Sequence, residues 1–397
     1  MSGACFSPEV PSALLKAKQV PSAVLRGSFS DSDSQFFKTE IIADPAALGR
    51  LIPQWEDLAA NALEPNPFYE HWMLRPALEC FAKPGEVEIF TLWKEGRLAA
   101  LFPFTRAQRY RGLPVGVLSA WRHRHCLLTT PLVRAEGAAA SCAALLGWLR
   151  AEAPLLEISY LPADGPFNAA LALAGARAYA DNKYERALLV KEGDADSYIA
   201  GAQSRHLRQE LRRRERRLGE RGKVAHTVMR ADDSLDRWVD EFLRLEAAGW
   251  KGREGSALAC SEPNRRFATE IFGGAFARGR LHMVGVDLDG KPLARCLSIL
   301  AGEGSYAFKT AYDEEFARYS PGVIVEVDRI REFHGLPGAQ WMDSFTAPDN
   351  AVLDSVWKGR RSIQRLLIGA SPRGRLAIAA LPLLSRAKKL LRRRTPK

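Results

Sequence analysis

The clearest candidate for chemistry in this sequence is a turn that precedes a helix, within the stretch SYAFKTAYDEEFARYSPGVIVEVDRIREF from Ser305 to Phe333. Ser320 and Pro321 predict the start of the helix, because Ser caps helices and Pro fits the first helical position. The first helical turn leaves N–H groups unpaired at the positive end of the helix dipole, where anions bind. Gly322 lets a ligand approach the backbone, and Arg318 adds a guanidinium group. The pattern indicates a phosphate site, with an ordinary capped helix as the alternative.

Two aspartates near this turn are candidates for moving a proton. Asp313 follows the predicted strand, beside the proposed phosphate turn, and the hydroxyl of Tyr312 could protonate a leaving group. Asp343 lies among apolar neighbours in a predicted strand, where a carboxylate needs a partner, and we expect Lys309 or Lys358 to supply it. Each aspartate also has a structural alternative: a solvated turn for Asp313 and an ion pair for Asp343.

Two further candidates follow Gly249, which predicts the end of a helix. Trp250 and Lys251 are therefore expected on a loop that lines a cleft. The tryptophan face suits a sugar or an acyl chain, and the lysine suits an anionic group. A core tryptophan and a surface lysine are the alternatives.

Several other chemistries lack their usual motifs. The six cysteines include no Cys-x-x-Cys pair, which argues against a structural zinc site and a disulfide framework. His123 and His125 alternate in the segment RHRHC, a spacing that could ligate a metal, but we predict no metal site. The sequence has no G-x-S-x-G elbow, no H-E-x-x-H, no phosphate-loop lysine motif and no dinucleotide-binding glycine motif, so it falls outside those classes.

Length and composition predict a folded protein of two domains, since the chain has 397 residues and 47% of them are hydrophobic. It has no apolar run of the roughly 18 residues that a membrane span needs. Its first residues, MSGACFSPEV, lack the basic and apolar regions of a secretory signal. We therefore expect a cytoplasmic protein.

The net charge of +11 is concentrated at the C-terminal end. Residues 371–397 carry nine Lys or Arg and no acidic residue, which leaves a net charge of +2 for the rest of the chain. Within this tail, the apolar run from Leu376 to Leu384 precedes the basic cluster, as in segments that lie on anionic membranes. We expect either peripheral contact with the inner membrane or a solubilising tail.

Two parts of the sequence repeat one order of elements. Each has a strand-turn-strand hairpin, then a helix, then a strand that ends in a Pro/Asp-containing turn before another helix. The matching segments are 87–104 with 281–300, 138–150 with 323–333, and 155–160 with 340–345. We infer an internal duplication of one α/β unit.

The repeat sets the expected domain boundaries. Residues 44–190 form the first domain, 191–370 form the second and 371–397 form the basic tail. Residues 1–43, rich in Ser, Pro and Gly, are expected to be loosely ordered.

A basic helix is predicted between the repeats, at Ser197 to Arg221, with Leu207, Leu211 and Leu218 on one stripe. Eight arginines lie between Arg205 and Arg221, partly neutralised by glutamates at helical pair spacing. We favour a solvated helical face, because the segment lacks aromatic residues for base stacking. A face for tRNA or for the phosphates of a cofactor is the alternative.

The order of helix, Gly249-Trp250-Lys251-Gly252, hairpin, KTAYDEEFARYSPG, helix and WMDS strand resembles a known group. It is similar to GNAT-superfamily acyltransferases of the CelD/BcsL type, associated with bacterial cellulose or exopolysaccharide synthesis, and in turn to Fem-type peptidyltransferases. The resemblance covers roughly residues 45 to 365. It implies an α/β (α+β) fold with two tandem GNAT-like domains, each a mixed, mostly antiparallel sheet flanked by helices.

By this resemblance the protein is expected to be an enzyme, an N-acyltransferase that moves an acyl group from acetyl-CoA or another acyl-CoA to an amine. The amine would belong to an amino sugar or a polysaccharide precursor. The second domain would be catalytic, and the first would lack a phosphate turn. The turn itself departs from the superfamily's glycine-rich form, because Pro321 has no N–H to offer a phosphate.

The resemblance and the residue types together give a set of expected site residues. Catalysis falls on Asp313, Tyr312 and Asp343; acyl-CoA binding on Arg318, Tyr319, Ser320, Gly322 and Val323; substrate binding on Trp250, Lys251, Lys309 and Lys358.

Two other functions stay open. One is a Fem-type transferase that uses a charged tRNA, which the arginines between Arg205 and Arg221 would bind; otherwise no nucleic-acid partner is expected. The other is an inactive scaffold at a polysaccharide synthase, held to the membrane by residues 371–397.

Overall fold

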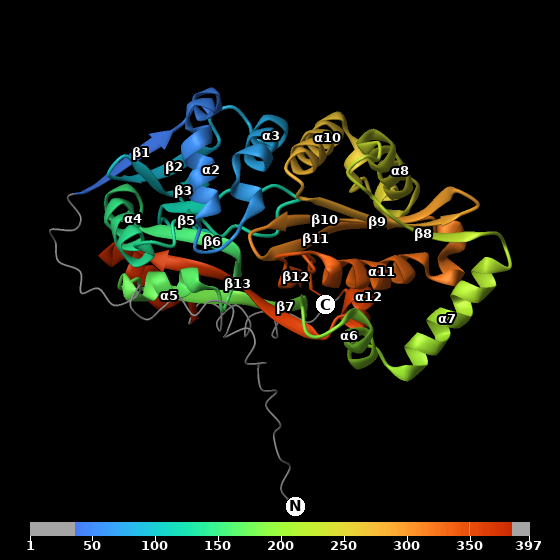
Figure 1. The fold of residues 1–397 in the computed structure, drawn as a ribbon. Coiled ribbons are helices and arrows are strands. Elements are labelled where there is room, and N and C mark those ends of the chain that lie inside the picture. The colour runs from blue at the N-terminus through green and yellow to red at the C-terminus, as the bar shows by residue number, and fades with distance from the viewer. Residues whose placement is uncertain (1–35, 349, 383–397) are drawn as a thin grey trace, which may run out of the picture.

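A single 13-stranded sheet runs through the molecule, with helices on both of its sides (Figure 1). The computed structural model describes residues 36–348 and 350–382. The mixed sheet and the flanking helices confirm the predicted α/β fold class. In the described residues, none of the helices is both long and apolar enough to cross a bilayer.

The first half of the chain follows the order strand, helices, four strands, helix, strand, helix, strand, and the short strand β5 among the four has no counterpart in the second half. Its elements are β1 (Phe37–Ile42), η2 (Pro45–Leu51), α2 (Ile52–Ala60), η3 (Pro67–Tyr69), α3 (His71–Phe81), β2 (Glu88–Lys94), β3 (Arg97–Ala107), β4 (Val117–Ala120), β5 (Leu132–Val133), α4 (Ala138–Glu152), β6 (Leu155–Pro162), α5 (Pro166–Leu173) and β7 (Ala178–Val190).

The second half repeats this order after two connecting helices, α6 (Ala195–Ala202) and α7 (Arg205–Gly219). Its elements are β8 (Val224–Val228), α8 (Leu235–Ala248), α9 (Trp250–Arg253), η4 (Leu258–Cys260), α10 (Glu262–Ala277), β9 (Leu281–Leu288), β10 (Lys291–Ala301), β11 (Gly304–Tyr312), η5 (Glu314–Tyr319), α11 (Pro321–Gly335), β12 (Trp341–Asp343), α12 (Ala351–Val356) and β13 (Gly359–Gly369). The duplication inferred from the sequence is thus present in the order of the elements.

The two hairpins of the repeat close with the same kind of turn. Glu95 and Gly96 join β2 to β3 with φ of 51° and 76°, and Asp289 and Gly290 join β9 to β10 with φ of 50° and 75°. Two consecutive residues with positive φ are typical of the tight hairpin turn whose twist matches that of the strands. This local chemistry explains why both hairpins could be predicted.

The halves exchange their last strands. The sheet order is β1-β2-β3-β4-β6-β13-β7-β12-β11-β10-β9-β8, so β13 lies between β6 and β7, and β7 lies between β13 and β12. Each half therefore pairs its parallel strand, β6 or β12, with the final strand of the other half. The predicted boundary at residues 190 and 191 separates the sequence repeats, whereas the hydrogen-bonded sheet continues across it.

This exchange leads to a prediction about the separated halves. Residues 36–190 and 191–382 expressed alone should each fail to fold, because each lacks a central strand of its sheet. The lost pairing and burial should exceed the roughly 5–15 kcal/mol by which a typical protein is stable. Circular dichroism and size-exclusion chromatography would check this, and co-expression should restore a soluble complex. A cooperative unfolding transition for either fragment alone would contradict the prediction.

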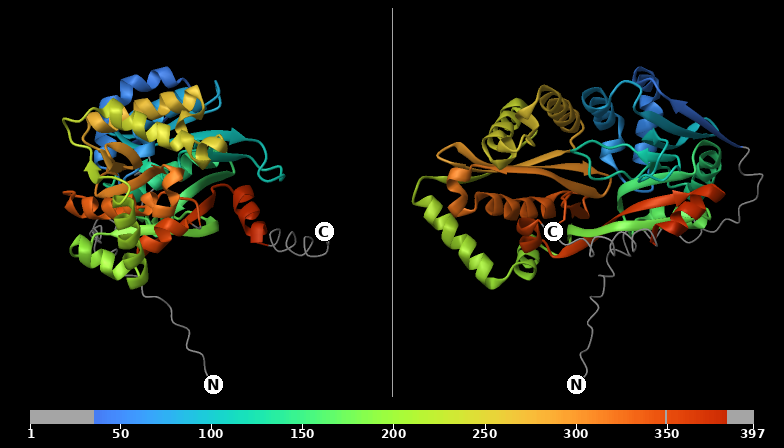
Figure 2. Two further views of the ribbon diagram at one scale, coloured as in Figure 1. Left: turned by 90° about the vertical axis from the view of Figure 1, so that its right-hand side faces the viewer. Right: turned by 180° about the vertical axis from the view of Figure 1, so that it is seen from behind.

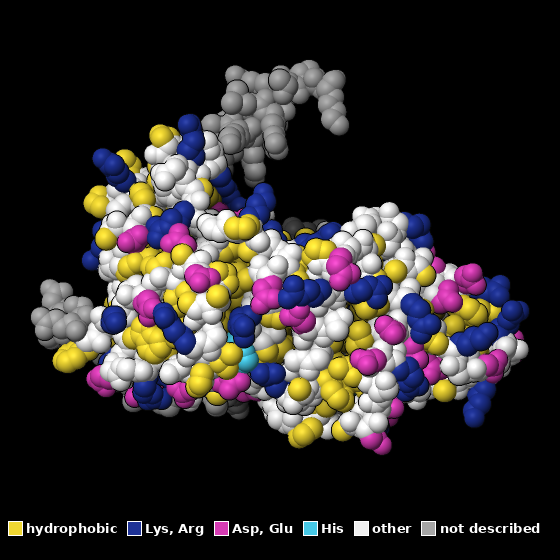
Figure 3. Space-filling model, turned by 90° about the horizontal axis from the view of Figure 1, so that it is seen from above, with side chains coloured by type: hydrophobic (Ala, Val, Ile, Leu, Met, Phe, Trp, Pro, Cys, Tyr) yellow, Lys and Arg dark blue, Asp and Glu magenta, His cyan; other side chains and the backbone are white. Residues whose placement is uncertain are grey.

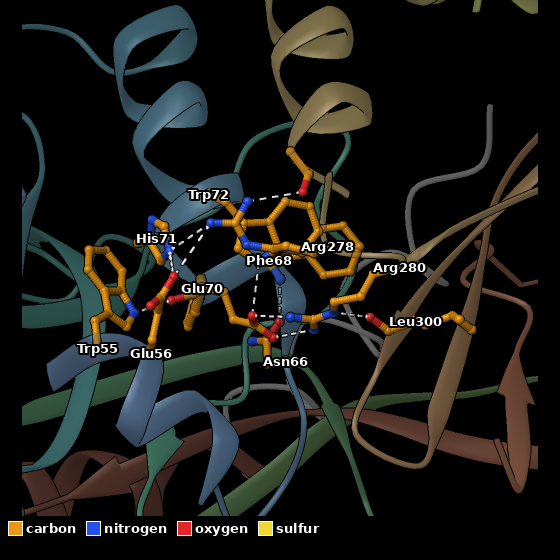
Figure 4. A network of polar contacts seen from close by, with 12 residues as sticks. Trp55, Glu56, Asn66, Phe68, Glu70, His71, Trp72, Arg278, Arg280 and Leu300 are labelled. Carbon is orange, nitrogen blue, oxygen red and sulfur yellow. Dashed lines mark hydrogen bonds and ion pairs between the residues drawn. The ribbon is translucent and has the colours of Figure 1, made fainter. Parts of the chain in front are cut away.

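An ion-pair network fixes the two halves against each other (Figure 4). The terminal nitrogens of Arg280, before β9, lie 2.5 and 2.6 Å from the carboxylate oxygens of Glu70, before α3. Arg280 also donates to the carbonyl of Leu300 at 2.6 Å, and Trp72 donates its indole N–H to Glu70 at 2.9 Å. Bidentate charged pairs of this kind have a defined geometry, so this one sets the position of β9 relative to α3.

Four helices, α2, α3, α8 and α10, cover one side of the sheet, and α11 and α12 lie on the other (Figure 1). In the second half, Leu297 of β10 packs in the same apolar cluster as Phe242 of α8. Its neighbour Cys296 packs in a separate cluster with Val325 of α11. On the side that carries the four helices, acidic, basic and apolar side chains are interleaved rather than sorted by charge (Figure 3).

Three expectations about the ends and the connecting segment need correction. Residues 37–42, assigned to a loosely ordered segment, form the edge strand β1, because they pair with β2 along their whole length. The single basic helix breaks at Ser204, whose side chain caps α7. Residues 372–382 are helical, and Ala377, Ile378 and Leu381 pack on the sheet next to Leu155. The remainder of the basic tail, 383–397, and residues 1–35 lie outside the described residues.

Candidate active site

A cavity of about 690 Å³ opens where β11 and β12 part. Gly304–Tyr306 of β11 pairs in parallel with Trp341–Asp343 of β12, and beyond these residues the two strands separate. The lining residues come from the two diverging segments, from α9, from the start of α11 and from the loop after β4: Arg124, His125, Leu127, Trp250, Lys251, Ser256, Ala307, Phe308, Lys309, Thr310, Tyr312, Ala317, Ser320, Gly322, Val323, Glu326, Arg329, Ser344, Phe345, Thr346, Ala347, Asn350, Val352 and Leu353.

The backbone at Phe345 holds the strands apart. Its φ of +52° is unusual for an aromatic residue, and such strain persists only where packing enforces it. The ring of Phe345 stacks on Phe68 of the first half, with centroids 4.4 Å apart and planes at 2°. The cavity therefore depends on contact between the halves.

The loop after β4 brings first-half residues to the same cavity. The ring of His125 lies 3.0 Å from the amide oxygen of Asn264, and burial lowers the pKa of His125 to about 4, so it is neutral at neutral pH. His123 instead stacks on Phe81 with centroids 4.8 Å apart. Within residues 36–348 and 350–382, no group of three or more His, Cys, Asp or Glu side chains is arranged to hold a metal ion.

Two lysines of the cavity lining share one buried carboxylate that lies behind them. Glu246 of α8 lies 3.3 Å from the amine of Lys309 and 3.4 Å from that of Lys251, and its side chain is fully buried. Glu246 also accepts from the N–H of Leu258 at 2.8 Å, while Lys251 donates to the carbonyl of Thr310 at 2.9 Å. This cluster places a titratable amine beside the cavity.

Burial and the neighbouring charge of Lys309 lower the pKa of Lys251 to about 8. Burial alone would raise the pKa of Glu246, but the charges of Lys309 and Lys251 outweigh it and hold that pKa below its usual value. At neutral pH the glutamate is therefore ionised, and Lys251 can lose its proton at little cost. A lysine with a pKa near the working pH is suited to general base catalysis.

The other end of the cavity is the N-terminus of α11. Ser320, in the left-handed conformation with φ +57°, precedes Pro321 at the first helical position, but contrary to expectation its side chain makes no capping hydrogen bond to the helix. The N–H groups of Val323 and Ile324 already bind the carbonyl of Ser320, at 2.9 and 3.1 Å. A side chain at Gly322 would meet the ring of Tyr312 at 2.9 Å. The turn therefore has few backbone donors for an anion, and Gly322 is the residue that leaves room for one.

An arginine of α7 supplements this turn, and the sequence reasoning missed it. The guanidinium of Arg214 donates to the hydroxyl of Ser320 and lies 2.8 Å from Glu210. The hydrophobic stripe predicted the packed face of α7, but an arginine among eight gives no signal of which one reaches the turn. The contact of Arg214 with the turn is visible only in the folded structure, where α7 packs against η5.

One histidine, paired with two carboxylates, holds α7 in this position. It lies at the end of the second half that is far from the first half (Figure 2). The ring nitrogens of His226, on β8, lie 2.5 Å from Asp328 of α11 and 2.8 Å from Glu215 of α7. These two carboxylates raise the pKa of His226 to about 10. The imidazole is therefore charged at neutral pH and links three elements.

Seven of the predicted site residues line the cavity, and they come from three separate elements: Trp250, Lys251, Lys309, Tyr312, Ser320, Gly322 and Val323. Trp250 begins the short helix α9 rather than lying on a loop, and it is 47% exposed at the cavity rim. Arg318 and Tyr319 lie on η5, outside the lining, with the guanidinium 4.7 Å from the centre of the tyrosine ring.

The two aspartates predicted as catalytic, Asp313 and Asp343, lie outside the cavity lining. Asp313 caps η5 by accepting from the N–H of Glu315 at 3.0 Å, and it is not part of the lining. Asp343 is fully buried between Arg186 and Arg361. The expectation that Lys309 or Lys358 pairs with it is wrong, because these two arginines from β7 and β13 reach it instead.

A buried ion pair thus replaces the proposed base at Asp343. Burial would raise the pKa of Asp343, but Arg186 and Arg361 outweigh it and hold the pKa below its usual value. Lys358 is exposed, and its backbone N–H donates to the hydroxyl of Tyr198 at 3.0 Å. The sequence reasoning did not single out two other buried carboxylates: Glu326, which lines the cavity, and Glu246, which lies behind the lysines of the lining.

Comparison with known proteins gives one family match. Residues 205–350 match the family described as Acetyltransferase (GNAT) domain. No curated protein matches the chain.

Three solved structures are similar to this chain at low identity. FemX is 12% identical, with a TM-score of 0.51 over 79% of this chain and 95% of that one. The C-terminal DUF2156 domain of an Agrobacterium fabrum protein named as a lysylphosphatidylglycerol synthetase is 13% identical, with a TM-score of 0.50 over 85% and 96%. A tandem GNAT protein from the clavulanic acid biosynthesis pathway is 16% identical, with a TM-score of 0.40 over 84% and 99%.

The family match and the architecture agree. The matched segment runs from α7 to the start of α12 and contains β11, β12 and the turn before α11. Residues 205–350 therefore form a GNAT-type acyltransferase domain, and the cavity between β11 and β12 lies inside it.

Proposed function

Since residues 205–350 form a GNAT-type acyltransferase domain, we propose that this protein transfers an acyl group from acyl-CoA, with acetyl-CoA as the simplest donor, to an amine. The observation that carries the proposal is the cavity between β11 and β12, which has a helix N-terminus at one end and, in its lining, Lys251, whose amine is paired with the buried Glu246.

The phosphates of the donor would lie against the turn before α11. Pro321 offers no N–H, and those of Val323 and Ile324 bind Ser320, so the backbone alone gives a weak anion site. The guanidinium of Arg214 compensates, because a charged donor binds phosphate about twice as strongly as a neutral one. The predicted contact from Arg318 would need its side chain to turn from the ring of Tyr319 toward the phosphates.

The reaction needs a neutral amine, a base and an acid. The amine nitrogen attacks the thioester carbonyl carbon, a C–N bond forms, and the C–S bond then breaks. Lys251, in its neutral form, takes the proton that the amine nitrogen loses. The hydroxyl of Tyr312, at the cavity wall, protonates the departing thiolate.

For the acceptor we propose an amino sugar or a polysaccharide precursor. The support is the exposed ring of Trp250 at the rim, which offers an apolar face, together with polar side chains such as Asn350 and Thr346 further along the lining. The cavity volume of about 690 Å³ is in the range of small-molecule sites, roughly 300–1,000 Å³.

Calorimetric titration of acetyl-CoA and longer acyl-CoAs into the protein tests the donor. We expect saturable binding that Gly322→Asp abolishes, because the new side chain would collide with Tyr312 and repel phosphate. Gly335→Asp, at the far end of α11 where an added side chain meets nothing within 4 Å, is the matched control. Folded protein that binds none of these donors would overturn the proposal.

A Fem-type, tRNA-dependent transfer is the second candidate, favoured by the arginines of α7. Two of them, Arg213 and Arg214, are paired with Glu210, and Arg208 donates to backbone carbonyls, which reduces the free basic surface. Salt-sensitive tRNA binding that is lost when Arg205, Arg216 and Arg217 become glutamine would support this candidate.

A further inference from the structure

A second cavity, of about 420 Å³, opens in the first half at the place that repeats the candidate active site. It lies beyond the parallel pairing of β4 and β6, just as the active-site cavity lies beyond that of β11 and β12. Tyr160 follows Ser159 here as Phe345 follows Ser344 there, and both aromatic residues have φ of +52°. The duplicated fold has thus kept two sites of the same origin.

The second cavity is not built for acyl-CoA. After β4 the chain turns back to pair with β3 as β5, and α4 begins only after that, so no helix N-terminus lines this cavity. Its lining is polar: Glu86, Thr105, Ser119, Ala120, Trp121, Arg122, Glu157, Ser159, Tyr160, Asn182, Tyr184, Gln364 and Arg365. A phosphate-bearing ligand has no backbone cradle here, so the side chains must define the ligand.

The charges of the lining balance, because two glutamates face two arginines. Arg365 is already held by Asp181 at 2.7 and 2.8 Å. Arg122 lies 4.7 Å from the centre of the Tyr160 ring, and no ion pair to it is present among the described residues. An ionic ligand of either sign would gain little, whereas hydroxyl, amide, carboxylate and guanidinium groups together can donate to and accept from a neutral one.

Two strained residues shape the same cavity. Tyr160 and Asn182 both have positive φ, of 52° and 50°. Asn182 lies where the register of β7 against β13 shifts, so its side chain is re-aimed relative to a regular strand. Strain of this kind persists only where the surrounding structure enforces it, and it clusters at functional sites.

We propose that this cavity binds a neutral carbohydrate. A sugar ring has an apolar C–H face, which an aromatic ring such as Tyr160 or Trp121 can cover, and hydroxyls that planar side chains such as Asn182 can bind in pairs. The hydroxyl of Tyr184, in this lining, lies 3.5 Å from the carbonyl of Thr346, which lines the active-site cavity. The carbohydrate site therefore adjoins the site of acyl transfer.

Titration of cellotetraose, maltotetraose and N-acetylated chitotetraose into the full-length protein, by calorimetry and by tryptophan fluorescence, tests the proposal. We expect saturable binding of at least one of them. Arg122→Ala and Asn182→Gly should each weaken it by about tenfold, the effect of a lost hydrogen bond to a polar ligand. Glycine relieves the strain at residue 182, so that variant should be at least as stable as the natural protein.

Glu95→Gly is the matched control, because Glu95 also has positive φ but lies in the β2–β3 turn, outside the cavity. It should leave carbohydrate binding unchanged. Acyl-CoA binding should be the same in all three variants, so the test is independent of the proposed donor. The proposal is overturned if the folded protein binds none of the three oligosaccharides, if it binds only a charged one such as tetragalacturonate, or if Arg122→Ala and Asn182→Gly have no effect.

Discussion

Replacing Lys251 by methionine should lower kcat by a factor of about 10²–10⁴, the contribution that a positioned general base makes. Methionine keeps most of the length and apolar contact of the side chain but cannot accept a proton. The measurement is the rate of thiol release from acetyl-CoA with an amino sugar such as glucosamine as acceptor. Binding of acetyl-CoA should be retained.

The pH dependence separates a base from a merely structural lysine. With a pKa of about 8, Lys251 is protonated in acid and cannot act, so kcat of the natural protein should rise as the pH rises through 8. This rise should be absent in Lys251→Met and in Lys251→Arg, whose guanidinium does not titrate in this range. An unchanged pH profile in Lys251→Met would show that the base is another group.

The second large effect concerns stability. Asp343→Ala should lower the free energy of unfolding by about 3–5 kcal/mol, because it leaves two arginine charges without a partner in the interior. The side chains of Arg186 and Asp343 are fully buried, and that of Arg361 is 12% exposed. These residues tie β7, β12 and β13 together at the centre of the exchanged strands. Urea denaturation followed by circular dichroism gives the change.

Asp181→Ala is the matched control for this prediction. Asp181, on β7, likewise pairs with two arginines, Arg111 and Arg365, but its side chain and that of Arg365 are 22% and 23% exposed. Its loss should cost about 1 kcal/mol or less, as for ion pairs that water screens. Because its pKa is lowered, Asp343 contributes its stability above the usual aspartate pKa and loses it only in stronger acid. If the two substitutions lowered the free energy of unfolding equally, burial would not determine how much stability is lost with an ion pair.

The contrast between Asp313, Asp343 and Glu246 shows where sequence reasoning about the site stopped. All three are acidic residues in or near strands or helices, and their sequence surroundings do not say which will pair with the lysines of the cavity lining. Glu246 sits on an amphipathic helix, where an acidic residue usually faces water, yet it is buried between two lysines from α9 and β11. The pairing with Lys309 joins residues far apart in the chain, so only packing reveals it.

The sequence alone determined what depends on neighbours along the chain. The hairpins follow from Glu95-Gly96 and Asp289-Gly290, and the start of α11 follows from Pro321 at its first position, since turn and helix-start preferences act within a few residues. The internal repeat was visible because each of its strands, turns and helices has such a local pattern in the sequence.

Only the tertiary structure decided the exchange of β7 and β13, the cavity shared by the two halves, and the reach of Arg214 to the phosphate turn. Strand pairing and ion pairs across a hundred residues or more leave no local pattern. They are selected by the burial and hydrogen bonding of the whole sheet, which is a property of the folded chain and of no single segment.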